Sequence, residues 1–185
     1  MADNFRDSPA DEEQFKFDPY THAVTVIDEN HRMIHDGFFY EVQQSDAALG
    51  NGGDIEILFD VPADSFPHLQ EIELSTDAGP IGFDFFEGTT TSAQGTAFGI
   101  VNKNRNSSNV AATVVTLAPT ITDDGTQLKT SQIPSASVAE LFSQSKGGEW
   151  VLKPSTQYLV RITNSSGGTA SINITINFYE VGYVN

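Results

Sequence analysis

The sequence contains no cysteine among its 185 residues. Disulfide bonds, thiolate metal ligands and a cysteine nucleophile are therefore all excluded. This absence does not identify the redox compartment. It leaves the stability of the fold to apolar packing, backbone pairing and contacts between subunits.

Long apolar runs are also missing. No segment approaches the roughly 18 apolar residues that a membrane-spanning helix needs. The chain starts with acidic and polar residues instead of a basic segment followed by an apolar one. We therefore expect neither a membrane span nor a classical export signal.

Basic residues are scarce. There are 9 Lys and Arg against 25 Asp and Glu, which gives a formal net charge of −16. Such a charge repels phosphate backbones and anionic lipid headgroups, so we expect no nucleic acid and no membrane partner. Two interpretations of the acidity stay open: solubility alone, or acidic patches that meet basic patches on a partner protein.

Recognisable catalytic motifs are absent from the sequence. It has no Gly-x-Ser-x-Gly elbow, no phosphate-binding glycine loop and no dinucleotide fingerprint. The carboxylate pairs Asp123/Asp124 and Glu71/Glu73 lack the aromatic and polar surroundings of a sugar-cleaving site. We expect a protein that is not an enzyme.

One group of residues resembles a metal site. His31, His35 and Asp36 lie close together in the sequence, and two histidines four residues apart would share one face of a helix. On an extended strand the two histidines would stand about 13 Å apart, which is too far for one ion. We therefore expect no metal and no cofactor.

Residues 1–20 form an acidic segment without a periodic apolar face. The aromatic residues Phe5, Phe15 and Phe17 stand isolated within it, which a purely solvating tail would not need. The sequence predicts an extended acidic arm whose phenylalanines attach either to a neighbouring subunit or to their own domain.

The strongest strand pattern spans residues 171–180. Its apolar face is expected in a core, and its other face is polar and uncharged, as at a hydrated subunit contact or an ordinary exposed surface. The apolar face consists of Ile172, Ile174, Ile176 and Phe178, and the polar face of Asn173, Thr175, Asn177 and Tyr179. A second strand at 157–163 and the flexible turn between them predict a terminal antiparallel hairpin.

Short segments rich in Val, Ile, Thr and aromatic residues predict further strands. These strands are expected at 22–28, 38–44, 54–61, 71–76, 81–87, 110–117 and 150–153. Eight or nine strands without a helical pattern favour an all-β fold over residues 21–185. We expect a two-sheet antiparallel sandwich that is jelly-roll-like, with an immunoglobulin-like sandwich as the alternative.

Three connecting segments carry their own signals. Ser137–Ser143 has apolar residues at helix spacing and predicts a helical turn that covers a sheet edge. Residues 88–109 are rich in Thr, Ser, Gly and Asn and predict a long loop that contacts a partner. Residues 123–126 predict a β-turn with Gly125 at positive φ.

Four segments carry a resemblance to a known family. They are HRMIHDGFF at residues 31–39, NKNRNS at 102–107, EWVLKPSTQYLVRITN at 149–164 and NFYEV at 177–181. Together they resemble small virion proteins encoded in the structural modules of tailed bacteriophages, of the head decoration or cement type. The match covers about residues 31–181 and leaves out the acidic arm.

The resemblance implies a function. It implies a jelly-roll-like protein of the virion, made in the host cytoplasm, that binds the outer surface of the major capsid protein lattice as a homotrimer or a dimer. It would have neither an enzymatic activity nor a cofactor. By bridging capsomers it would stabilise the expanded head against the pressure of the packaged DNA.

Two groups of contact residues follow from this interpretation. Capsid contacts are expected in the arm and the 88–109 loop, and subunit contacts on the polar strand face and at the tryptophan, which could instead fill one end of the core. The capsid-contact candidates are Phe5, Phe15, Phe17, Asn104 and Arg105. The subunit-contact candidates are Trp150, Asn173, Thr175, Asn177 and Tyr179.

Two other functions remain as alternatives. A glycan-binding jelly roll of a tail fibre or carbohydrate-binding protein would need exposed coplanar aromatics, for which only Trp150 and some tyrosines are available. An enzyme of the cupin or hydrolase kind would need clustered His and Glu, which this spacing does not provide.

Overall fold

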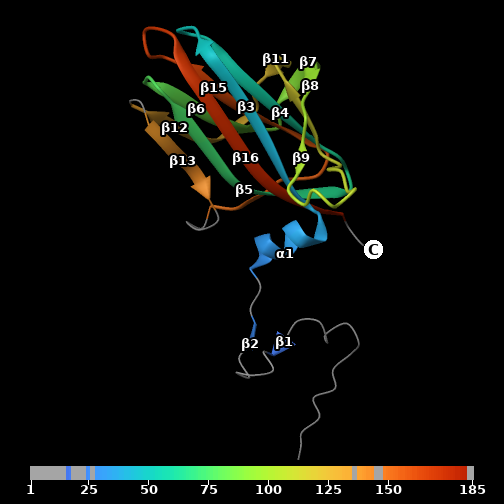
Figure 1. Ribbon diagram of the computed structural model, residues 1–185. Helices are drawn as coiled ribbons and strands as arrows, with labels where there is room; N and C mark the ends of the chain where they lie inside the picture. The colour runs from blue at the N-terminus through green and yellow to red at the C-terminus, as the bar shows by residue number, and fades with distance from the viewer. Residues whose placement is uncertain (1–15, 18–23, 26–27, 135–136, 144–147, 183–185) are drawn as a thin grey trace, which may run out of the picture.

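Eight long antiparallel strands form two stacked sheets in the computed structural model, which describes residues 16–17, 24–25, 28–134, 137–143 and 148–182 (Figure 1). The long strands are β3 Phe39–Leu49, β4 Asp54–Val61, β5 Ser65–Thr76, β6 Ile81–Glu87, β12 Thr126–Ile133, β13 Ser137–Ser143, β15 Thr156–Asn164 and β16 Ala170–Gly182. Sheet I has the order β13-β5-β16-β3-β9, and sheet II the order β12-β6-β15-β4-β10-β8.

The pairing of the eight long strands is nested. The first pairs with the last, the second with the seventh, the third with the sixth and the fourth with the fifth: β3 with β16, β4 with β15, β5 with β13 and β6 with β12. An antiparallel ribbon rolled up into two sheets gives this order, which is that of a jelly roll and differs from an immunoglobulin sandwich. The predicted all-β sandwich is confirmed.

Several short elements complete the fold. The short strands are β1 Lys16–Phe17, β2 Val24–Thr25, β7 Thr90–Ala93, β8 Thr96–Ala97, β9 Val101–Asn102, β10 Val114–Leu117, β11 Thr120–Asp123 and β14 Trp150–Val151. One helix, α1 Glu29–Asp36, lies at the lower end of the sandwich in Figure 1. No helix of the described residues is long and apolar enough to cross a membrane.

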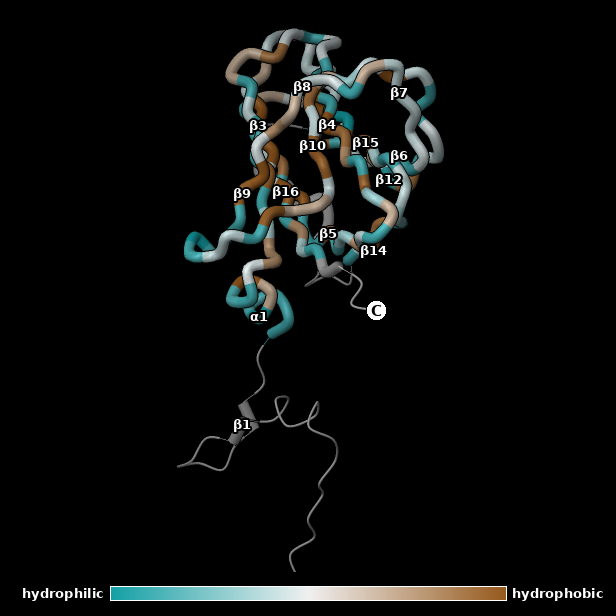
Figure 2. The backbone as a smooth tube through the Cα atoms, turned by 90° about the vertical axis from the view of Figure 1, so that its right-hand side faces the viewer, coloured by the Kyte–Doolittle hydropathy of each residue, from teal (hydrophilic) through white to brown (hydrophobic). Residues whose placement is uncertain are grey.

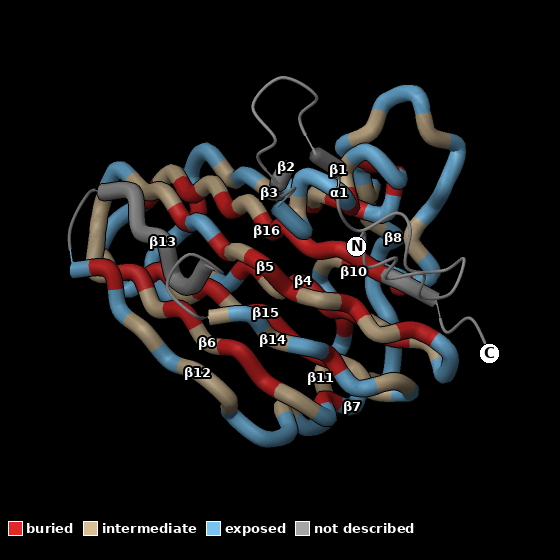
Figure 3. The backbone as a smooth tube through the Cα atoms, turned by 90° about the horizontal axis from the view of Figure 1, so that it is seen from below, coloured by how far each residue is buried: buried red, intermediate tan, exposed pale blue. Residues whose placement is uncertain are grey.

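The main core lies between the two sheets. The inward residues predicted for the last strand, from Ile172 to Phe178, are fully buried. The apolar side chains that face them from sheet II are buried as well. Aromatic rings fill the centre: Phe178 lies 5.5 Å from Tyr40 and 5.9 Å from Phe59, between ring centroids. Figure 3 shows the resulting alternation of buried and exposed positions along the strands.

A second apolar cluster lies on the outer face of sheet II. Leu58, Leu159 and Phe86 are buried there, and Ile121 of β11 packs against them. The strands β7 and β11, which pair only with each other, therefore cover a patch of sheet II that would otherwise be exposed to water.

Arg161 fastens this cover to the sheet. Its guanidinium makes a two-pronged ion pair with Asp124 at 2.8 and 2.6 Å, and its Nε donates to Glu56 at 2.8 Å. The same cation lies 5.5 Å from the centre of the Phe86 ring. These contacts raise the pKa of Arg161 and keep it charged, chiefly through the hydrogen bonds to Asp124.

The predicted strands agree with the observed ones to different degrees. β4 and β6 have the predicted bounds, whereas β3, β5, β15 and β16 are longer and β10 and β14 are shorter.

The predicted turn at residues 123–126 is confirmed, since Gly125 has a φ of +84°. A Cβ there would lie 2.3 Å from the Glu87 carbonyl oxygen, so only glycine fits.

The predicted terminal hairpin is wrong. β15 pairs with β4 and β6 in sheet II, whereas β16 pairs with β3 and β5 in sheet I. The buried Asn164 amide donates to the carbonyls of Leu49 at 2.7 Å and Gly168 at 2.9 Å, and thereby fixes the crossing from one sheet to the other. Two alternating strands and a flexible turn are compatible with either connection.

The predicted helical turn at Ser137–Ser143 is also wrong, because this segment is β13 and pairs with β5 at the edge of sheet I. A seven-residue helix makes few hydrogen bonds of its own, whereas the free edge of a long strand offers a complete ladder. The predicted 88–109 loop contains the short strands β7, β8 and β9.

Candidate interaction surface

Helix α1 has well-defined ends. The Asp28 side chain accepts hydrogen bonds from the backbone N–H groups of Asn30 at 3.0 Å and His31 at 3.3 Å. Gly37 ends the helix with a φ of +78°. On the side toward the sandwich, the buried Met33 packs with Phe39 and Tyr179.

The 102–109 loop holds the C-terminal end of α1. Three asparagine amides of the loop donate to three successive carbonyls that the helix end leaves without helical partners. The pairs are Asn102 to Gly37 at 2.8 Å, Asn104 to His35 at 2.8 Å and Asn109 to Asp36 at 3.3 Å. Figure 2 shows this hydrophilic loop beside α1. The segments 31–39 and 102–107, distant in the sequence, therefore form one structural unit.

A pocket of about 410 Å³ opens between this loop and strands β8 and β10. Apolar side chains such as Phe98, Ile100 and Val115 line it together with polar ones, and Val110 and Val114 are also among the lining residues. These two valines are 84% and 53% exposed. Exposed apolar side chains around a concavity are typical of a contact with another molecule.

Arg105 also lines this pocket. Its guanidinium donates to the Asn102 carbonyl at 3.4 Å, and within the described part of the chain it makes no ion pair. In a protein of charge −16, a cation without an acidic partner among the described residues is notable. We call Arg105, Val110 and Val114 the loop-end surface.

A buried carboxylate fixes the chain below this surface. Glu180, only 5% exposed, accepts hydrogen bonds from the backbone N–H of Ala112 at 2.6 Å and of Thr113 at 3.0 Å. The hydroxyls of Thr113 and Ser65 donate to it as well. Burial and the nearby Glu180 charge raise the pKa of Tyr40, which lines the pocket. The loop-end surface is therefore attached to a rigid base.

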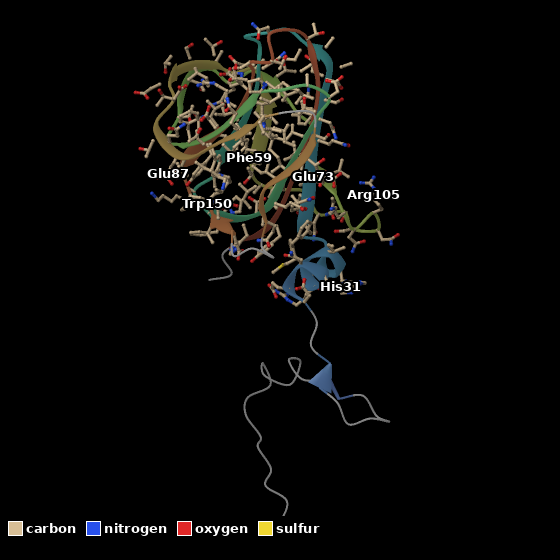
Figure 4. The ribbon with its side chains drawn as sticks, turned by 90° about the vertical axis from the view of Figure 1, so that its left-hand side faces the viewer. His31, Phe59, Glu73, Glu87, Arg105 and Trp150 are labelled. Atoms are coloured by element: carbon tan, nitrogen blue, oxygen red, sulfur yellow. The ribbon has the colours of Figure 1, made fainter. Side chains whose placement is uncertain are left out.

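Asn104 and Arg105, predicted as capsid contacts, both lie in this region. Asn104 binds α1, and Arg105 is among the residues that line the pocket; its side chain is labelled in Figure 4. Sequence reasoning missed the two exposed valines, which it placed in a strand at 110–117. Of the arm candidates, Phe17 lies in β1, and Phe5 and Phe15 lie outside the described residues.

The predicted subunit-contact residues of β16 lie together on the outer face of sheet I. Asn173 and Thr175 are partly exposed, whereas Asn177 and Tyr179 are buried by their neighbours. Asn177 accepts from Lys103 at 3.0 Å and donates to Glu71 at 2.9 Å. The strands on both sides of β16 carry carboxylates on this outer face of sheet I, so the face is polar and acidic. The β16 residues at the centre of the face are uncharged.

Tyr179 belongs to a polar cluster with His68 and Glu149. Its ring stacks on His68 at 4.4 Å between centroids, and Glu149 Oε1 lies 2.6 Å from His68 Nδ1. Burial acts to raise the pKa of Glu149, but hydrogen bonds from His68, Gln70 and Tyr179 outweigh it and lower the pKa overall. The Gln70 Oε1 atom is buried with no hydrogen-bond partner among the described residues. This cluster fastens the segment before β14 to sheet I.

Trp150 connects the two sheets at one edge. Its backbone pairs with Leu69 of sheet I, while its ring meets Phe85 of sheet II edge-on at 5.9 Å. The side chain is half-buried and packs against the main core. Trp150 thus fills an end of the sandwich, and part of it stays accessible.

The structure overturns the argument against a histidine pair. Residues 29–36 are helical, so His31 and His35 lie one turn apart with their Nε2 atoms 3.0 Å from each other. The expected separation of about 13 Å was wrong because it assumed a strand. No group of three or more His, Cys, Asp or Glu side chains able to hold a metal occurs among the described residues.

No protein-family model matches the sequence, and a search of curated proteins finds no match. A search of solved structures finds similarity to a chain of the crystal structure of the T13 IBDV viral particle, with 11% sequence identity and a TM-score of 0.20. The similar region covers 91% of this protein and 44% of that chain, so the protein spans less than half of its length.

Proposed function

We propose that this protein is a head decoration protein of a tailed bacteriophage, which binds the outer surface of the major capsid protein lattice and bridges capsomers. The observation that carries the proposal is the loop-end surface, where exposed valines and an arginine that makes no ion pair with the described residues line a pocket on a rigid jelly roll. The sequence resemblance stated above points to the same class.

The rigidity of the surface favours binding. The Asn102, Asn104 and Asn109 amides hold the loop to α1, and Glu180 holds residues 112–113 to β16. A surface that is ordered before it binds loses less conformational entropy on binding. Small contacts of this kind reach high affinity when many are linked, as in an oligomer on a repeating lattice.

The chemistry of the surface defines the partner. Val110 and Val114 require an apolar patch, and Arg105 requires an acceptor such as a carboxylate. The overall acidity of the chain suits a lattice surface that is basic around this patch. The glycan-binding alternative gains no support from Trp150, whose ring is packed edge-on against Phe85.

Co-sedimentation with phage heads assembled without this protein tests the proposal. We expect the full chain to sediment with the heads and Val110→Asp to weaken binding at least about tenfold, because it places a carboxylate in an apolar contact. Val151→Asp is the matched control, since Val151 is 54% exposed but lies on β14, away from the pocket.

Two outcomes would contradict this assignment. If the full chain does not sediment with the heads, the decoration function is wrong. If Val110→Asp and Val151→Asp bind equally well, the loop-end surface is not the contact. A chain that starts at Thr21 lacks the arm, so comparing its head binding with that of the full chain measures the contribution of the arm to binding. Weaker binding of the shorter chain would support the predicted role of residues 1–20 as a clamp.

A further inference from the structure

The exposed side of α1 carries two histidines one helical turn apart. His31 and His35 are both exposed, their ring centroids are 4.5 Å apart, and their Nε2 atoms are separated by 3.0 Å. Residues at i and i+4 face the same side of a helix, and a pair of histidines at this spacing can bind one ion.

The separation of the two nitrogens fits a shared ion. Metal–nitrogen distances for imidazole are about 2.0–2.1 Å, so two neighbouring ligands of one ion lie roughly 2.9–3.4 Å apart for bond angles of about 90–110°. The observed 3.0 Å lies within this range. A hydrogen bond between the rings fits the same distance. When the donor ring changes tautomer and carries its proton on Nδ1, the Nε2 atoms of both rings are free for a metal.

The backbone that carries the two histidines is fixed before any ion arrives. Asp28 caps its first turn, and Asn104 binds the carbonyl of His35 itself at 2.8 Å. The nearby Arg32 forms ion pairs with Glu29 at 2.6 Å and Asp36 at 2.9 Å, so its positive charge is compensated. Little rearrangement is needed for binding, and a dication meets no unpaired positive charge on the helix.

We propose that His31 and His35 form a binding site for a late first-row divalent metal ion, Cu²⁺ ahead of Ni²⁺ and Zn²⁺. Imidazole nitrogen favours these ions, whereas Mg²⁺ and Ca²⁺ require oxygen ligands. With no third ligand among the described residues, water fills the remaining positions, and they face solvent. The site is independent of the capsid-binding function proposed above.

Calorimetric titration of the metal-free full chain with CuSO₄, ZnCl₂ and MgCl₂ tests the site. We expect one Cu²⁺ per chain, weaker Zn²⁺ binding and no heat from Mg²⁺. His31→Ala and His35→Ala should each weaken Cu²⁺ binding at least about tenfold, because each leaves a single imidazole without the gain from linking two ligands. His22→Ala is the control and should bind Cu²⁺ as the unchanged chain does.

Nuclear magnetic resonance gives a readout that does not depend on the variants. Substoichiometric Cu²⁺ is paramagnetic and should broaden the imidazole signals of His31 and His35 before those of His68 in the unchanged protein. Broadening that starts elsewhere, an unchanged affinity in either alanine variant, or an equal loss with His22→Ala would each overturn the two-histidine site. Circular dichroism confirms that the variants keep the fold.

Discussion

At the residue scale, Glu180 shows how a single side chain joins strand, loop and pocket. Its carboxylate lies at one end of β16, is nearly inaccessible, and accepts hydrogen bonds from both backbone and hydroxyl groups. A signal in the sequence could have revealed it. Ile172, Ile174, Ile176 and Phe178 point inward, and Glu180 occupies the next position of the same parity. An acid in a core-facing position requires donors around it.

The substitution Glu180→Gln should destabilise the protein by roughly 2 kcal/mol or more, because a neutral amide places an N–H group against donors and weakens charge-assisted hydrogen bonds. Urea denaturation followed by tryptophan fluorescence measures the change. Glu73→Gln is the control: Glu73 is exposed on neighbouring β5, and the change there should stay within about 0.5 kcal/mol. Equal stability of the two variants would show that the carboxylate contacts of Glu180 contribute little.

At the element scale, β7 and β11 form a cover that an ion pair joins to sheet II. The cover buries Leu58, Leu159 and Phe86, and the Asp124 carboxylate at its end binds Arg161 of β15. The hydrogen bonds from Arg161 lower the pKa of Asp124. Because that pKa is lower in the folded than in the unfolded chain, the contact stabilises the fold above the unfolded pKa and is lost as pH falls through the folded one.

This linkage predicts that the unfolding temperatures of the unchanged protein and of Asp124→Asn differ by an amount that depends on pH. The variant should unfold at a lower temperature at neutral pH, and the gap should close as the pH falls from about 4 toward 2. Differential scanning calorimetry over this range measures it. In an Arg161→Gln background the same change should have little further effect. A gap that stays constant with pH would contradict the linkage.

At the scale of the whole molecule, the jelly roll separates two surfaces. Helix α1 lies at one end of the sandwich (Figure 1), and the pocket adjoins the loop that holds it. Asn173 and Thr175, in contrast, lie on the outer face of sheet I. The proposed decoration function needs one surface for the lattice, and the predicted oligomer needs another for contacts between its copies. We assign the loop-end surface to the lattice and the β16 face to the oligomer, which we expect to be a trimer.

Light scattering tests the oligomer. The full chain should give the mass of a trimer, and Thr175→Arg should shift it toward the monomer by placing a bulky charge in the centre of the β16 face. Thr130→Arg is the matched control, because Thr130 is exposed on β12 of sheet II and should leave the mass unchanged. A trimer that survives Thr175→Arg would exclude this face, and a monomeric full chain would contradict the predicted assembly.

Much of the fold is determined by the sequence alone. Alternation over residues 54–61, 81–87 and 171–180, broken only at Leu58 and Phe86, predicts strands whose inward faces the structure buries. Apolar side chains with a period of two lie on one face only when the segment is an extended strand. Gly125 likewise predicts its turn, since only glycine fits there. The class of fold and most of its core needed no tertiary information.

The tertiary structure decided what local patterns leave open. Whether β15 and β16 pair or cross between sheets depends on Asn164 reaching Leu49, a residue more than a hundred positions away. Residues 29–36 become a helix because Asp28, Gly37 and the asparagines of a distant loop satisfy its ends. The loop-end surface arises from such long-range contacts, which no short window of sequence contains. The histidine pair has helical spacing in the sequence, and its rings meet because residues 29–36 are a helix.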